Sequence, residues 1–318
     1  MRVAIIGLGV IGKVHAEIIR KQAELVAVCD VDTKTFVGFD DCEKFIDYRD
    51  MIDEIMPDVV HVCTPHYLHA EMVIYSLNKN VNVFCEKPLC TNFADLDEIL
   101  NAEKLSSAQL GVCLQNRYTP INKFIKEFTI NNPPISAMAN VTWCRNKDYY
   151  SQAEWRGKWN SEGGGVLINQ ALHTLDILQW ICGYPERLTA ITANLTLKRE
   201  IEVEDTACVL CKGKVPFTFY ATNGSSVNFH IEITIYTKNG IIRANPNMVI
   251  VDDEIVETNL DLKYYGKKCY GSGHDLIIPD FYICILNKQK FPMDGKEGAK
   301  VLNLILSAYQ SKGEEILL

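Results

Sequence analysis

Two polar residues that lie far apart in the chain, Lys87 and His173, are of types that could move a proton on a small molecule. Lys87 follows Glu86 and a short apolar run, Val81–Cys85. A lysine ammonium at the end of such a strand can hydrogen-bond an alcohol and stabilise the alkoxide that develops as hydride leaves. Burial lowers the pKa of such a lysine, which allows it to transfer the proton. The alternative is a solvated loop lysine.

His173 lies in a segment that begins with three glycines, residues 163–165, and continues as an apolar helical pattern from Ile168 to Ile181. Histidine titrates near neutrality and is the commonest general base. Asn169 precedes it by four residues, so a helix would place both side chains on one face. The glycines would let backbone approach a ligand closely. The alternative is a core histidine bonded to a backbone carbonyl, and Asp176 is expected to be structural.

The first dozen residues predict a strand-to-helix turn that binds a dinucleotide. An apolar run stops at Gly7, and a helical pattern starts with Val10 and Ile11. In this context, Gly7, Gly9 and Gly12 form the G-x-G-x-x-G pattern. The first glycine makes the tight turn, the second admits a pyrophosphate, and the third lets helix and strand pack closely. Backbone N–H groups at the helix start favour the phosphate charge.

A second apolar run, Glu24–Cys29, ends in the acid Asp30. A carboxylate at this distance from the glycines binds the ribose hydroxyls of a dinucleotide. It would also repel a 2′-phosphate, and no arginine follows it in residues 31–33. We therefore predict NAD rather than NADP as the cofactor.

Further polar residues fall where strands are predicted to end or in a loop rich in aromatic and charged residues. Thr64 and Asn116 follow predicted strands, so they should line the dinucleotide cleft. Arg156 could bond the nicotinamide amide or a substrate carboxylate, and Trp155 could stack on a sugar face. Arg117 should face the same cleft. Packing at a domain interface is the alternative for the last three.

Composition is that of an ordinary two-domain globular protein. The chain has 318 residues, 47% of them hydrophobic and 23% charged, with a net charge of −8. Without long runs of one sign, nothing suggests nucleic acid or a membrane as a partner. Twelve cysteines are scattered, many within apolar strand patterns, which favours reduced thiols in a cytoplasm. No ligand spacing for a metal is evident, so none is expected.

The order of elements predicts the fold class. Strands and helices alternate over residues 1–118, which is typical of a parallel, doubly wound Rossmann domain. Residues 119–318 carry several strands without intervening helices, and turn signals such as Asn223-Gly224 separate them. We expect an α/β chain whose second, α+β domain holds a large, mostly antiparallel open sheet.

Several motifs, in order, resemble the glucose–fructose oxidoreductase / inositol dehydrogenase (Gfo/Idh/MocA) family. The resemblance covers essentially the whole chain. The motifs are Gly7–Gly12 with His15, Thr64-Pro65 with His69, Glu86-Lys87-Pro88, the triple glycine leading to His173 and Asp176, Pro292-Met293-Asp294-Gly295, and a closing helix with Tyr309.

The resemblance implies NAD(P)-dependent oxidation of a secondary alcohol on a sugar, cyclitol or sugar derivative, or the reverse. It implies Lys87 and His173 as the catalytic pair, a cis bond before Pro88, and a homodimer or homotetramer formed through the second domain's sheet. Asn169 is counted with the catalytic residues, and it joins Arg117, Trp155 and His173 as a substrate contact. The cofactor contacts expected are Gly7, Gly9, Val10, Ile11, Gly12, Asp30, Thr64, Pro65, His69, Glu86, Lys87, Asn116 and Arg156.

Two departures from the family pattern leave alternatives open. Many members carry aspartate where this chain has Asn169, and an amide cannot take a proton; His66 stands where asparagine is frequent. A related reductase acting on a nucleotide-linked sugar, and a non-catalytic protein that senses NAD(H), remain alternatives. Substrate specificity is expected in the loops Cys144–Ser161 and Tyr264–His274.

Overall fold

The computed structural model describes residues 1–258 and 272–318, and most of the loop Tyr264–His274 lies outside these residues. The chain forms two compact units. The described residues of unit 1 are 1–115 and 272–299, and those of unit 2 are 116–258 and 300–318. The division at residues 118 and 119 stays a prediction about domains. By contact, residues 272–299 group with unit 1, although the sequence suggested the second domain for them.

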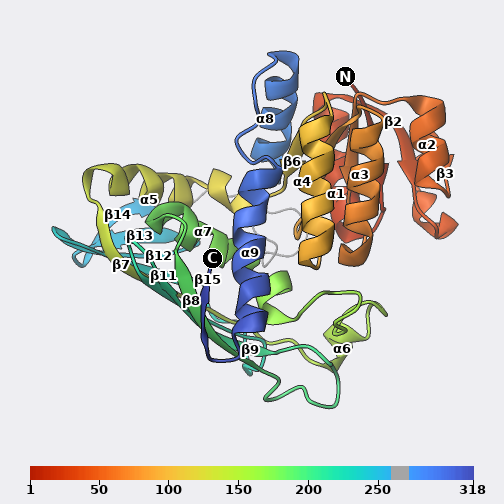
Figure 1. Ribbon diagram of the computed structural model, residues 1–318. Helices are drawn as coiled ribbons and strands as arrows, with labels where there is room; N and C mark the ends of the chain where they lie inside the picture. Colours follow the sequence, from red (N-terminus) through yellow and green to blue (C-terminus); the bar gives the residue numbers. More distant parts are fainter. Residues whose placement is uncertain (259–271) are drawn as a thin grey trace. The chain divides into compact units, whose positions relative to one another are not determined.

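Unit 1 is built on a sheet of six parallel strands, which confirms the expected Rossmann architecture (Figure 1). The strand order is β3-β2-β1-β4-β5-β6: β2 and β3 are added on one side of β1, and β4 to β6 are added on its other side. The strands are β1 (Arg2–Ile6), β2 (Glu24–Cys29), β3 (Glu43–Phe45), β4 (Val59–Val62), β5 (Asn82–Cys85) and β6 (Leu110–Val112). All four residues of β4 are buried, as a strand covered on both faces requires.

Helices cover this sheet in two layers. Helix α1 (Val10–Gln22) packs with α8 (His274–Leu286), and α3 (His69–Asn78) packs with both α2 (Tyr48–Ile55) and α4 (Phe93–Leu105). Side-chain caps start two of them: Asp47 accepts from the N–H of Arg49, and Asn92 accepts from that of Asp95. The remaining short helical turns of the unit are Thr33–Phe36 and His66–Leu68.

Unit 2 holds a nine-stranded sheet in the order β14-β13-β12-β11-β7-β10-β9-β8-β15. Every neighbouring pair is antiparallel except β10 with β7, so the mostly antiparallel sheet is confirmed. The strands are β7 (Pro134–Thr142), β8 (Arg187–Ala193), β9 (Thr206–Lys212), β10 (Phe217–Thr222), β11 (Glu232–Thr237), β12 (Gly240–Asn245), β13 (Met248–Val251), β14 (Glu254–Thr258) and β15 (Glu315–Leu317).

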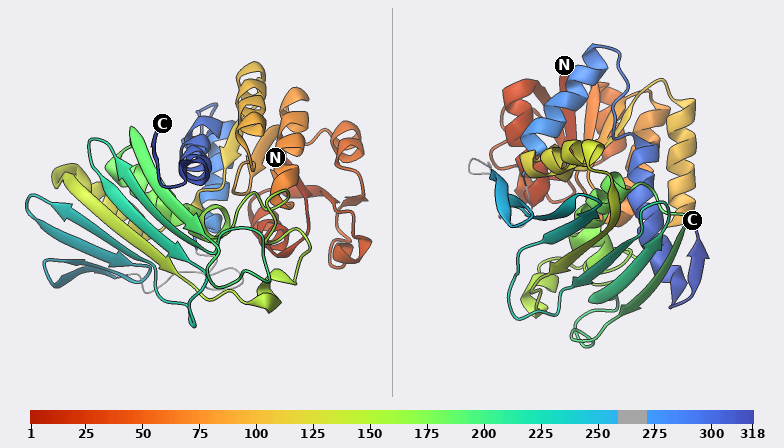
Figure 2. Two further views of the ribbon diagram at one scale, coloured as in Figure 1. Left: turned by 60° about the horizontal axis from the view of Figure 1, so that its bottom comes forward. Right: turned by 90° about the vertical axis from the view of Figure 1, so that its left-hand side faces the viewer.

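The two faces of this sheet differ in their surroundings. Helices α5 (Pro120–Asn131) and α7 (Leu172–Cys182) pack on one face, and in Figure 2 no helix of the described residues covers the opposite face, which is called the bare face below. Side chains alternate accordingly, for example buried Val209 beside exposed Leu210. The exposed large apolar side chains of these strands include Ile191, Leu210 and Tyr220, and Ile191 and Tyr220 both pair with Cys208.

The other helices of the chain are short or connect the units. Helix α6 (Lys147–Tyr150) lies in unit 2, and α9 (Gly295–Ser311) runs from unit 1 into unit 2. The short turns Gln115–Tyr118 and Val166–Ala171 complete the set that the structure describes. Within residues 1–258 and 272–318, no helix combines the length and the apolar composition that crossing a membrane requires.

Candidate active site

The glycine turn between β1 and α1 has the properties that phosphate binding requires. Gly7 has a φ of +92°, and a Cβ there would lie 2.7 Å from the carbonyl oxygen of Cys63. A Cβ on Gly12 would lie 1.9 Å from the carbonyl oxygen of Gly7. At Gly9, by contrast, a Cβ would meet nothing within 4 Å. The first and third glycines thus serve the fold, while the second leaves open space at the helix start, where Val10 and Ile11 begin α1.

Asp30 is tied to this turn by hydrogen bonds. Its Oδ2 accepts from the backbone N–H of Leu8 at 2.7 Å, and its Oδ1 accepts from that of Asp32 at 2.9 Å. The carboxylate therefore lies beside the glycine turn, where the sequence placed a ribose-binding acid. Its contact with a cofactor stays a prediction.

His69 connects two loops at the carboxyl edge of the sheet. Its Nδ1 lies 2.7 Å from the carbonyl oxygen of Pro88, and its Nε2 lies 2.8 Å from that of Thr64. Burial lowers the pKa of His69, although these hydrogen bonds partly oppose the shift. A neutral ring donates to only one of the two carbonyls. In the structure both ring nitrogens face backbone, so His69 holds the loops of Thr64-Pro65 and Lys87-Pro88 together; a cofactor contact stays a prediction.

Lys87 follows β5 in a loop fixed by its neighbours. The Lys87-Pro88 bond is cis, as the family resemblance implied. Glu86 is buried, and its Oε2 accepts from the backbone N–H of Lys87 at 3.3 Å. Its other oxygen, Oε1, lies 3.0 Å from Nε2 of His15. The carboxylate predicted to bind the cofactor thus hydrogen-bonds the protein, and that prediction stays open.

Glu86 is the end of a buried chain of hydrogen bonds whose direction can be derived. The Nδ1 atoms of His15 and His61 lie 2.8 Å apart, so one must donate and the other accept. Burial lowers the pKa of both rings, which keeps them neutral. A neutral His15 that donates from Nε2 to Glu86 must accept at Nδ1, so His61 donates from Nδ1. The Nε2 of His61 is then the acceptor for the hydroxyl of Tyr282, 2.8 Å away.

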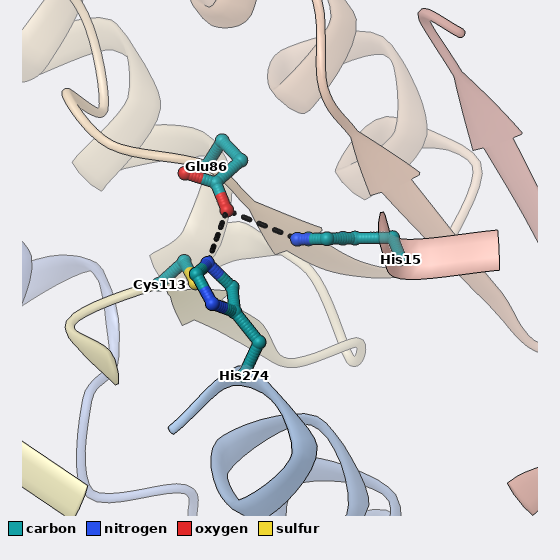
Figure 3. Close-up of side chains that lie close together, drawn as sticks. All are labelled: His15, Glu86, Cys113 and His274. Atoms are coloured by element: carbon teal, nitrogen blue, oxygen red, sulfur yellow. Dashed lines mark hydrogen bonds and ion pairs between the residues drawn. The ribbon is translucent and has the colours of Figure 1, made fainter. Parts of the chain in front are cut away.

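A second histidine reaches the same carboxylate (Figure 3). The Nε2 of His274 lies 3.5 Å from Oε1 of Glu86. Burial opposes ionisation of Glu86, but the hydrogen bond from His15 and the proximity of His274 hold the pKa of Glu86 well below the usual range. One potential ligand atom from each of His15, Glu86, Cys113 and His274 lies within 4.8 Å of the others. The expectation of no metal therefore stays a prediction.

In unit 2, the glycine run packs against the protein itself. A Cβ on Gly165 would lie 1.8 Å from the carbonyl oxygen of Glu204, and one on Gly164 would lie 2.1 Å from the hydroxyl of Tyr309. The Glu204 carboxylate accepts from the N–H of Gly165 at 2.8 Å, from that of Leu167 at 3.0 Å and from Tyr309 Oη at 3.0 Å. Packing against Tyr309 and the backbone of Glu204 therefore explains Gly164 and Gly165, and the expected approach of a ligand to this backbone stays a prediction.

The segment that carries Asn169 and His173 differs from the single helix expected over residues 168–181. Residues Val166–Ala171 form a π-helical turn, and α7 starts at Leu172. The two side chains therefore belong to different helical segments, and the i, i+4 geometry of one α-helix does not apply to them. Single π-helical turns occur frequently at functional sites.

Asn169 contacts a buried carboxylate that sequence reasoning missed. Its Nδ2 donates to Oε1 of Glu162, and the Tyr149 hydroxyl lies 3.5 Å from the same nitrogen. Glu162 is fully buried and also accepts from the N–H of Gly157. In the sequence it is one acid in a loop rich in charges, and no local pattern marks it as buried.

Arg117 and Asp176 form a buried ion pair. Nε and Nη2 of Arg117 lie 2.7 and 2.6 Å from the two carboxylate oxygens, and the side chains are 4% and 1% exposed. Gln179 also donates to Asp176 at 3.0 Å. This geometry agrees with the structural role expected for Asp176. For Arg117 it adds a packing role, and the substrate contact stays a prediction.

Arg156, in the loop after β7, lies close to two aromatic rings. The Arg156 guanidinium carbon lies 4.4 Å from the Tyr149 ring centre and 5.4 Å from that of Trp155. Nη1 of Arg156 donates to the carbonyl oxygen of Tyr149 at 3.3 Å. Asn116 lies in the turn Gln115–Tyr118, where its carbonyl oxygen accepts from Asn122 at 2.8 Å. Contacts of Asn116, Trp155 and Arg156 with ligands stay predictions.

Both units match sequence models of one protein family. Residues 1–114 match the family described as GFO_IDH_MocA, oxidoreductase family, NAD-binding Rossmann fold. Residues 134–243 match the GFO/IDH/MocA C-terminal domain.

Individual relatives agree with this match. Myo-inositol 2-dehydrogenase from Thermotoga maritima is 24% identical and aligns with 99% of this chain and 97% of its own. D-glucoside 3-dehydrogenase from Escherichia coli is 30% identical, but only 58% of this chain and 55% of the relative align. Among solved structures, WlbA dehydrogenase from Bordetella pertussis, in complex with NADH and UDP-GlcNAcA, has a TM-score of 0.87 at 28% identity and covers 100% of this chain and 98% of that one.

Proposed function

Because the chain belongs to the GFO/IDH/MocA family of NAD-binding oxidoreductases, we propose that it oxidises a secondary alcohol of a sugar, cyclitol or sugar derivative, or catalyses the reverse reduction. The observation that carries this proposal is the glycine turn of unit 1, where Gly9 faces open space at a helix start beside Asp30. In parallel sheets, ligands bind at the carboxyl ends of the strands, and Lys87 follows one of these ends.

The cofactor that fits these residues is NAD. Gly7, Gly9 and Gly12 with Val10 and Ile11 would hold the pyrophosphate, and Asp30 would accept from the ribose hydroxyls. The Asp30 carboxylate would repel a 2′-phosphate, which supports NAD over NADP. When bound, the nicotinamide supplies the hydride acceptor. The other contacts proposed are Thr64, Pro65, His69, Glu86, Lys87, Asn116 and Arg156.

Lys87 and His173 are proposed to share the proton transfer. A lysine ammonium can donate to the substrate oxygen and stabilise the negative charge that develops on it. A neutral imidazole can accept the hydroxyl proton. Asn169 orients the substrate by hydrogen bonds, and Arg117 and Trp155 are proposed as further substrate contacts. The hydrogen bonds of Glu86 and His69 hold the backbone on both sides of Lys87.

A nucleotide-linked sugar is the second candidate substrate. The observation that favours it is the likeness to WlbA dehydrogenase, whose structure holds UDP-GlcNAcA, over the whole of this chain. Arg156, which lies close to the rings of Tyr149 and Trp155, is a cation of the kind that binds phosphate or carboxylate groups of such a substrate.

We also propose a cytoplasmic location and a homo-oligomer. The eleven cysteines that the structure describes are all free thiols, which suits a reducing compartment. The bare face of the unit 2 sheet, with its paired apolar side chains, is the surface proposed to join two copies.

Alanine substitution tests the catalytic pair. Lys87→Ala and His173→Ala are each expected to lower kcat about 100-fold or more, because general acid–base groups contribute at least that much. The dissociation constant for NADH, measured by fluorescence titration, should stay within about threefold of the wild type in His173→Ala. Lys87→Ala, which also removes a proposed cofactor contact, should weaken NADH binding by much less than it lowers kcat. Lys104→Ala and His230→Ala, both at exposed positions, are the matched controls. Normal turnover by both Lys87→Ala and His173→Ala would show that the assignment is wrong.

A further inference from the structure

The feature that calls for explanation is a fully buried acid, Glu162, beside the amide of Asn169. Glu162 is 0% exposed, whereas Asn169 is half-buried. One carboxylate oxygen, Oε2, accepts from the N–H of Gly157, and the other, Oε1, accepts from Nδ2 of Asn169. Neither atom is used by the proton transfer proposed above.

The hydrogen bond between Asn169 and Glu162 determines which way the amide of Asn169 points. A primary amide has one donor edge and one acceptor edge, and the surrounding hydrogen bonds decide their orientation. A carboxylate only accepts, so the nitrogen of Asn169 must face Glu162. The Tyr149 hydroxyl lies on the same side, where Nε2 of Gln170 also donates to it at 3.0 Å. The acceptor Oδ1 is then the edge of the amide opposite Glu162.

The backbone around Glu162 prevents the carboxylate from turning away. Gly157 has a φ of +75°, and a Cβ there would lie 2.6 Å from the side chain of Ile201, so this loop is closely packed. Ile201 belongs to a small buried cluster with Tyr150, Leu197 and Val203. Rotation of the Glu162 carboxylate would leave the buried N–H of Gly157 without its acceptor, which is unfavourable.

We propose that Glu162 is a positioning residue that fixes the amide of Asn169 so that its Oδ1 accepts a hydrogen bond from a hydroxyl of the alcohol substrate. This inference rests on the proposed function. The pair holds one carboxylate, at position 162. Two carboxylates in contact would have to share a proton.

Substitutions that exchange the carboxylate at position 162 and the amide at position 169 test this proposal. In Glu162→Gln, the single oxygen accepts from Gly157, so the new NH2 group faces Asn169 and turns its amide over. The edge opposite residue 162 becomes a donor, and KM for the alcohol is expected to rise about tenfold or more. The dissociation constant for NADH should not change. In Asn169→Asp, two carboxylates meet, and a loss of both turnover and thermal stability is expected.

The double variant Glu162→Gln/Asn169→Asp should again place a hydrogen-bond acceptor on the edge of residue 169 that is opposite residue 162. The amide introduced at position 162 then accepts from Gly157 and donates to the carboxylate introduced at position 169, whose other oxygen is again an acceptor. KM is expected to return to within about threefold of the wild type. Glu154→Gln, an exposed acid in the same loop, is the matched control. An unchanged KM in Glu162→Gln, or a double variant no better than the product of the two single effects, would overturn the proposal.

A measurement that does not depend on turnover separates this inference from the proposed function. The side-chain amide signals of Asn169 in a ¹⁵N-labelled sample are identified by their loss in Asn169→Asp. They are expected to shift strongly in Glu162→Gln and to stay in place in Glu154→Gln. If no sugar or polyol is oxidised but these shifts are observed, the proposed function fails while the orientation by Glu162 stands. Unshifted signals in Glu162→Gln refute the orientation, whatever the activity.

Discussion

Glu204 is the buried carboxyl group expected to make the stability of unit 2 depend on pH. Burial raises its pKa from 4.5 to about 7, although Gly165, Leu167 and Tyr309 donate hydrogen bonds to it. Between these two values the folded state holds a proton that the unfolded state has released. Stability is therefore full below about pH 4.5 and is lost as pH rises through 7, by about 3 kcal/mol.

Urea denaturation of the wild type and Glu204→Gln between pH 5 and 8 checks this prediction. The variant should be less stable at pH 5, because its NH2 group faces an N–H or hydroxyl donor. It should lack the loss of stability that Glu204 causes between pH 5 and 7. Identical pH dependence in the two proteins would contradict the assignment.

At the residue scale, the sequence predicted the surroundings of a residue where these depend on a motif close to it in the chain. Asp30 follows a strand at a fixed distance from the glycines, and the structure places it against Leu8. Glu162 and Glu204 could not be located in this way. A single acid in a charged loop is typical of a solvated position, and the partner that helps bury Glu204 is Tyr309, 105 residues later in the chain.

At the scale of elements, the turn between β1 and α1 gives a paired prediction. Gly12→Ala places a Cβ 1.9 Å from the carbonyl oxygen of Gly7, so the thermal midpoint of unfolding should fall strongly. Gly9→Ala, just before the helix, meets open space and should leave that midpoint within about 2 °C, because a substitution that clashes with nothing costs little. The added methyl group should nevertheless weaken NADH binding about tenfold or more.

Calorimetry and NADH fluorescence titration measure these two effects separately. A Gly9→Ala variant that binds NADH as tightly as the wild type would show that the open space at Gly9 is not the phosphate site. A Gly12→Ala variant of unchanged stability would contradict the close packing of helix and strand.

Periodicity in the sequence predicted the elements of unit 1 and most of those in unit 2. It could not reveal the π-helical turn Val166–Ala171, because an apolar pattern does not distinguish this hydrogen bonding from that of an α-helix. It also missed β13, β14 and β15. Strand β15 has three residues and pairs with β8, more than 100 positions away, so nothing local signals it.

At the scale of the whole molecule, the bare face of the unit 2 sheet predicts association of two copies. Ile191 is 64% exposed and Tyr220 is 40% exposed, and each of them pairs with Cys208 on the strand between them. Burying such a surface is favourable, so we expect a dimer or tetramer at micromolar concentration. Tyr220→Glu with Leu210→Glu should give monomers in light scattering after size-exclusion chromatography, without loss of NADH binding. A monomeric wild type would contradict this expectation.

The fold class followed from the alternation of strands and helices, since that order allows few topologies. The membership of residues 272–299 in unit 1 did not follow from order alone. It depends on contacts between distant segments, such as the hydrogen bond of Tyr282 to His61 and the packing of Phe281 on Phe84.

The most direct measurement is the rate of NADH formation with a panel of inositols, aldoses, uronates and UDP-linked sugars, with NADP in parallel. We expect turnover with members of one substrate class, about tenfold or more faster with NAD than with NADP because Asp30 repels a 2′-phosphate. Failure to oxidise any member of the panel while NADH still binds tightly would contradict the proposed oxidation and favour a protein that senses NAD(H).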